Sequence, residues 1–103
     1  MSKVLVALRS PEDVDAMRLG AKISRERGAD MAVYQVRPRD SDSRSDLALQ
    51  RRITAMLRAT LGVFADDIPV FVVGEMSGDD FASLAATWDA DVLVTDGNIE
   101  AIT

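Results

Sequence analysis

Four short runs of apolar residues recur along the chain, and each is typical of a strand that is buried on both faces. These runs are Val4–Leu8, Met31–Val36, Val70–Val73 and Val92–Val94. They are rich in β-branched residues and lack the strict alternation expected of a strand with one face in water. The pattern therefore predicts a mainly parallel, four-stranded sheet with helices on both of its faces.

Between these runs, segments with an apolar residue at every third or fourth position predict three helices. The first is expected to begin within Ser10–Asp13, where a serine cap, a proline and acidic residues suit a first turn, and to end at Gly28. The second is expected to run from Ser43–Asp46 to Gly62, and the third to begin near Ser77–Asp80. Each start has the spacing Ser-x-x-Asp, at intervals of 33 and 34 residues that match one strand–helix step. The alternation of strands and helices predicts a three-layer α/β/α fold.

The composition fits one globular domain over residues 1–103, with 48% hydrophobic and 28% charged residues. The sequence contains neither cysteine nor histidine, which excludes disulfides, cysteine nucleophiles, Ser–His–Asp triads and histidine zinc sites. No other set of residues places a nucleophile beside a base, so we expect a protein that is not an enzyme. Paired aspartates such as Asp79-Asp80 are interpreted as helix-start and loop charges, so no metal site is expected.

The net charge of −5 disfavours nucleic acid as a partner, because binding to phosphates needs a basic surface. Residues 37–58 depart from this balance, with six arginines against three aspartates, and are interpreted as a solvated loop and helix face. No run of about 18 apolar residues predicts a membrane-spanning helix. The first strand is too short for the apolar part of a signal peptide, so the cytoplasm is the expected location.

Ligands of open parallel sheets bind at the carboxyl ends of the strands, so the residues that follow each strand are the candidate site. The candidate ligand- or anion-binding residues are Arg9, Ser10, Val36, Arg37, Arg39, Asp96 and Gly97. If the first two strands are neighbours, three arginine side chains meet beside a helix N-terminus, which suits a phosphate or a carboxylate. The alternative is that Arg9 forms an ion pair with Asp96. Neither G-x-x-x-x-G-K-[ST] nor G-x-G-x-x-G is present.

The order of the motifs resembles that of the universal stress protein family. The resemblance rests on VLVALRS at Val4–Ser10, GADMAVYQVRP at Gly28–Pro38, Phe81-x-x-x-Ala85, and ADVLVTD at Ala90–Asp96. It implies the sheet order 3-2-1-4. ATP-binding members carry an acidic residue where this chain has Arg9, and the first glycine of a glycine-rich loop where it has Asp96. The rest of that loop and the usual fifth strand are expected to be absent, which implies a degenerate nucleotide site and no resident cofactor, with ATP or AMP disfavoured.

The resemblance implies a non-catalytic regulatory or stress-response module that acts through self-association or a protein partner. The alternative is a sensor that binds a nucleotide or another anionic small molecule at the ends of the first, second and fourth strands. Without a fifth strand, Val92–Val94 would be a sheet edge that needs a cover. Either the tail Asn98–Thr103 or a second subunit could cover it, and we expect a homodimer through this edge and tail.

Overall fold

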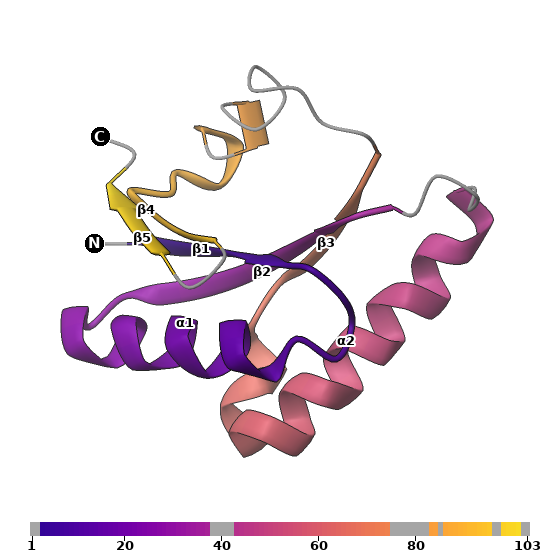
Figure 1. Cartoon of the computed structure of the whole chain (residues 1–103), viewed down its shortest axis with the longest axis horizontal. Helices are drawn as coiled ribbons and strands as arrows, with labels where there is room; N and C mark the ends of the chain where they lie inside the picture. Colours follow the sequence, from indigo (N-terminus) through magenta and orange to yellow (C-terminus); the bar gives the residue numbers. More distant parts are fainter. Residues whose placement is uncertain (1–2, 38–42, 75–82, 85, 96–97, 102–103) are drawn as a thin grey trace.

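Five strands form one sheet in the order β3-β2-β1-β4-β5, as Figure 1 shows for the computed structural model, which describes residues 3–37, 43–74, 83–84, 86–95 and 98–101. The strands are β1 (Lys3–Leu8), β2 (Asp30–Val36), β3 (Val70–Val73), β4 (Val92–Thr95) and β5 (Asn98–Ala101). The first four are parallel, and their order 3-2-1-4 confirms the expected topology.

Helices cover both faces of the sheet, which confirms the three-layer α/β/α architecture (Figure 1). One face carries α1 (Val14–Arg27) and α2 (Asp46–Leu61), and short 3-10 segments, η1 (Ser43–Ser45) and η2 (Gly62–Asp67), flank α2. Residues 83–84 and 86–88 are helical and pack on the opposite face. No helix in the described part of the chain is long and apolar enough to cross a membrane.

The alternation of side chains along each strand divides the core between the two faces of the sheet. Val4 and Val6 of β1 point toward α1 and α2, where they are buried with Met17 and Leu57. The intervening Leu5 points to the other face. In the described part of the chain that second cluster is smaller, and its buried and partly buried members there are Leu5, Ala32, Ala90, Tyr34, Phe71, Leu84 and Trp88.

The cap of α1 differs from the expected serine, although it lies within the expected segment Ser10–Asp13. Asp13, rather than Ser10, is the N-cap, and its Oδ1 accepts the backbone N–H of Ala16 at 3.4 Å. The predicted C-terminal cap is confirmed, because Gly28 has the left-handed φ of 61° and its N–H bonds back to the helix. The third expected start, Ser77–Asp80, lies outside the described residues.

The expectation that no fifth strand would form is wrong, but the tail that begins at Asn98 covers β4, which was one of the two expected alternatives. β5 pairs antiparallel with β4, from Thr95 opposite Asn98 to Val92 opposite Ala101, so β4 is not an edge of the sheet. This strand has four residues, two of them polar, and is too short to produce an apolar run. The signal that predicts it is the Asp-Gly dipeptide at 96–97, since Asp-Gly between two short strands favours a two-residue hairpin.

Candidate functional site

The carboxyl ends of β1 and β2 lie side by side, as the candidate arginine cluster requires. Leu8 is opposite Gln35 in the parallel register, so Arg9 and Arg37 both follow the carboxyl ends of neighbouring strands, at the same end of the sheet. Val36, the last residue of β2, is 41% exposed there, whereas Ser10 is half-buried.

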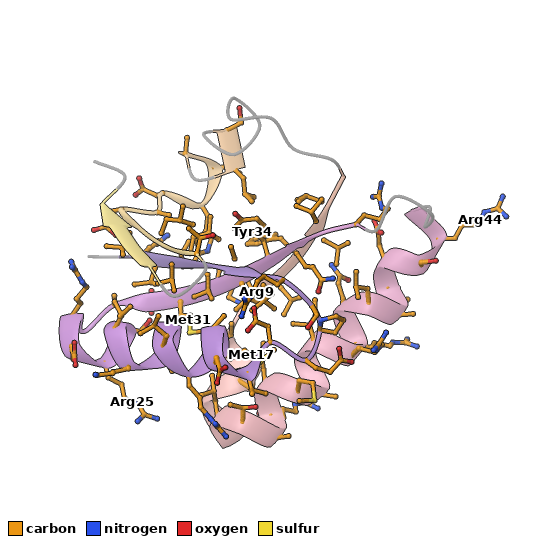
Figure 2. All side chains as sticks on the ribbon, in the orientation of Figure 1. Arg9, Met17, Arg25, Met31, Tyr34 and Arg44 are labelled. Carbon is orange, nitrogen blue, oxygen red and sulfur yellow. The ribbon has the colours of Figure 1, made fainter. Side chains whose placement is uncertain are left out.

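Arg9 binds a carboxylate of its own loop. Its Nε donates to Oδ2 of Asp13 at 3.2 Å, and its backbone N–H donates to the same oxygen at 3.0 Å. The Arg9 side chain is 68% exposed, but that of Asp13 is only 6% exposed. Figure 2 shows Arg9 at the turn between β1 and α1. A buried carboxylate that is bound by two backbone amides and a guanidinium is thus the anion of this loop.

Hydrogen bonds within the loop also occupy the first amides of α1. The N–H of Asp13 donates to the carbonyl of Ser10 at 3.2 Å, and that of Val14 donates to the carbonyl of Glu12 at 2.8 Å. The N–H of Ala16 donates to Asp13, as described above. The helix N-terminus, which otherwise attracts anions, therefore directs several of its donors at acceptors within the chain.

The pKa of Asp13 is lowered from its ordinary value by these contacts. Burial raises the pKa, but the hydrogen bonds from the backbone and side chain of Arg9 and from the backbone of Ala16 lower it further than burial raises it. The carboxylate is the form that accepts all of these bonds, so the ionised state is stabilised.

Arg37 is directed toward α2. Its Nε and one terminal nitrogen donate to the two carboxylate oxygens of Asp46 at 2.8 and 2.7 Å, which is the geometry of a bidentate pair. The pair lowers the pKa of Asp46, chiefly through the hydrogen bond from Arg37. The backbone N–H of Arg37 donates to the carbonyl of Val73 at 2.6 Å, so the residue also continues the sheet toward β3.

The structure brings Arg9 and Arg37 to one edge, as expected, and gives each an acidic partner. Asp13 was not among the candidate site residues, although its spacing of four from Arg9 and its place before a helix were visible signals. Arg39, Asp96 and Gly97 lie outside the described residues, so the pairing of Arg9 with Asp96 stays a prediction.

Gln35 is a polar residue at this edge that the sequence pattern did not single out. It is 5% exposed, and within the described part of the chain its Oε1 has no hydrogen-bond partner. The residues described contain no group of three or more acidic side chains that could hold a metal ion.

Comparisons with known proteins place the fold but give no match in sequence. No protein-family model and no curated protein matches the chain. A crystal structure of a universal stress protein in complex with cAMP superposes with a TM-score of 0.61 at 20% identity, covering 89% of this chain and 69% of that one. The universal stress protein from Archaeoglobus fulgidus gives a TM-score of 0.57 at 18% identity, over 91% of this chain and 74% of the other.

Proposed function

Since the chain has the fold of universal stress proteins, we propose that it is a non-catalytic regulatory module with a degenerate nucleotide site, which acts by self-association or by binding a protein partner. The observation that carries this proposal is the carboxylate of Asp13, which occupies the donors at the end of β1.

A phosphate in the place of the Asp13 carboxylate would need the same groups that Asp13 uses. These are the N–H of Arg9, the N–H of Ala16 and the guanidinium of Arg9. To bind them, the phosphate would have to displace a buried carboxylate and leave it beside a second negative charge, which is strongly unfavourable. An internal anion thus opposes nucleotide binding at the strand ends.

The second candidate is a sensor for a nucleotide or another anion. It is favoured by the cAMP complex of a protein with this fold, and by the arrival of Arg9 and Arg37 at one edge of the sheet. It requires that a ligand recruit arginines that already hold Asp13 and Asp46.

Isothermal titration calorimetry with ATP, AMP and cAMP separates the two candidates. We expect no saturable heat at millimolar ligand, and no release of phosphate from ATP on incubation. Saturable binding that Arg9→Ala weakens about tenfold or more would contradict the proposal and favour the sensor. Arg58→Ala is the matched control, because Arg58 lies near the C-terminal end of α2, away from Arg9, and forms a similar ion pair with Asp66 of η2.

Self-association is proposed to use the outer side of β5, which is a terminal strand of the described sheet. Backbone groups on the outer side of such a strand are a template for pairing with a second chain. We expect light scattering to give a dimer at high micromolar concentration, and a monomer there would contradict this part of the proposal.

Two proline variants test the surface. Successive residues of a strand point their N–H groups to opposite sides, so one of Ile99→Pro and Glu100→Pro removes an outward donor while the other removes a bond to β4. We expect the variant with the smaller loss of stability to be the one that is monomeric. If that variant remains a dimer, the surface does not lie on β5.

A further inference from the structure

A cavity of about 450 Å³ lies at the opposite end of the sheet from the strand-end site. It is enclosed by the last turns of α1, the end of α2, the segment after η2 and the start of β2. Its lining includes Ala21, Ser24, Ala29, Met31, Leu61 and Ile68. Its volume is within the range of small-molecule sites in proteins.

The cavity exists because the last part of α1 and the turn after it carry small side chains. Ala21, Ser24 and Gly28 leave space between the helix, β2 and the segment before β3. The glycine at 28 is required by its left-handed backbone, and a Cβ there would meet no atom within 4 Å. Helix packing against the sheet is therefore close at Gly20 and open toward the end of the helix.

The lining is apolar with one unmatched polar group. Ser24 is 9% exposed, and its Oγ is buried with no hydrogen-bond partner among the described residues. A buried hydroxyl without a partner destabilises the fold, so a ligand that bonds to it recovers stability that the empty cavity lacks.

The side chain of Met31 lines the same cavity as Ser24 and can move. Figure 2 shows it between the sheet and α1, and it is 7% exposed. Methionine has three rotatable bonds and adapts to irregular space, so the thioether of Met31 can shift to accommodate a ligand beside Ser24 without moving the backbone.

The charged side chains are at the mouth of the cavity and have both signs. Arg25, Asp30 and Asp67 are exposed lining residues, and Figure 2 shows Arg25 extending from α1 away from the sheet. Opposite charges at the mouth do not select a ligand of one charge. An apolar interior with a single hydroxyl favours an uncharged ligand.

We propose that this cavity binds a small, uncharged, mainly apolar molecule with one hydroxyl group, which forms a hydrogen bond with Ser24. The site is separate from the strand-end arginines and from the β5 surface, so it adds a ligand to the regulatory module proposed above and does not depend on it.

The test uses the full chain, labelled with ¹⁵N, and two probes that differ by one hydroxyl, 4-ethylphenol and ethylbenzene. We expect 4-ethylphenol to shift the amide signals of Ser24, Gly28, Ala29 and Ile68 saturably, with roughly fivefold higher affinity than ethylbenzene. Ser24→Ala is expected to remove that difference by weakening 4-ethylphenol and leaving ethylbenzene unchanged.

A second variant tests the place. Ala21→Leu extends a larger side chain into the cavity and is expected to weaken the binding of both probes, whereas Ala55→Leu, at an exposed position of α2, is the control and should bind as wild type. The proposal is overturned if neither probe shifts the cavity amides, if the shifts cluster on the other face of the sheet, or if Ser24→Ala keeps the preference for 4-ethylphenol. Ser24→Ala decides the matter even if Ala21→Leu does not fold.

Discussion

At the scale of single residues, Asp13 is the side chain that holds the loop between β1 and α1 in place. One carboxylate caps α1, fixes the backbone of Arg9 and pairs with its guanidinium. The loop between β1 and α1 is held further by an ion pair between Glu12 and Arg52 of α2, which is exposed and therefore contributes little. Most of the order in the loop depends on one side chain.

Asp13→Asn is expected to lower the free energy of unfolding by about 1 kcal/mol, because asparagine can still cap α1 but lacks the charge and the second acceptor oxygen that bind Arg9. Urea denaturation followed by circular dichroism measures the change. Asp15→Asn is the control, since Asp15 is exposed in the same turn, and its effect should stay within about 0.5 kcal/mol. Equal losses in the two variants would mean that the charge of Asp13 and its bonds to Arg9 contribute nothing specific.

The lowered pKa of Asp13 predicts the direction of the acid response. A carboxyl whose pKa is lower in the folded than in the unfolded state contributes stability above the unfolded pKa and loses it as the pH falls through the folded value. We expect thermal unfolding to show stability declining below about pH 4, where free aspartate titrates. The decline should be shallower in Asp13→Asn; parallel curves for the two proteins would exclude Asp13 as a source.

The sequence predicted that Arg9 and Arg37 would meet at one edge, because the run-and-helix pattern places the strand ends there. It did not predict which acids they bind. From the sequence, Asp13 could be interpreted as an ordinary first-turn acid and Asp46 as part of a loop. In the structure, their carboxylates face the two guanidiniums.

At the scale of elements, the approach of α1 to the sheet depends on Gly20. A Cβ at this position would lie 2.4 Å from Cγ2 of Val6 and 3.2 Å from Cε of Met31. Val6 is fully buried on the central strand and has little room to give. A larger residue at 20 therefore has to push the helix from the sheet.

Gly20→Ala is expected to lower the free energy of unfolding by about 2 kcal/mol, although alanine is the better helix former. The second variant, Val6→Ala, removes the methyl group that the new Cβ would meet. In a double-mutant cycle measured by urea denaturation, Gly20→Ala should be less harmful in the Val6→Ala background. Additive losses would mean that the close contact does not set the helix position.

All four apolar runs form strands and the first two expected helices are present. These elements could be predicted because packing on both faces of the sheet determines the spacing of apolar residues along the sequence. Two features escaped. The cap of α1 is Asp13 and not Ser10, since it is the Asp13 carboxylate that accepts the backbone N–H of Ala16. β5 was missed, because a four-residue strand with polar members has no hydrophobic signature and depends on its partner β4.

At the scale of the whole molecule, the two layers of helix differ in how firmly they are packed. Ile53 and Leu57 of α2 are fully buried against the sheet, whereas Leu84 and Trp88 of the opposite layer are only half-buried. Among the residues that the structure describes, the side with α1 and α2 therefore contributes more hydrophobic stability.

Leu57→Ala is expected to lower the free energy of unfolding by about 3 kcal/mol, and Leu84→Ala by about 1 kcal/mol, because the second side chain is already half in water. Native-state hydrogen exchange should show residues 86–88 exchanging through local opening, and β1 and β2 only through global unfolding. Equal losses and uniform protection would show that the two layers are equally stable.

The central position of β1 also determines the order in which the fold can assemble. One neighbour of β1 is β2, which follows it in the sequence after a single helix. The other neighbour, β4, is distant in the sequence: Val4 pairs with Val92, and the N–H of Lys3 donates to Asp91, 88 residues away. Closing so large a loop is entropically slow, so β1, α1 and β2 are expected to form a nucleus and the β4–β5 hairpin to join last. Until then the middle strand of the finished sheet is an edge, open to pairing with another chain while folding is incomplete.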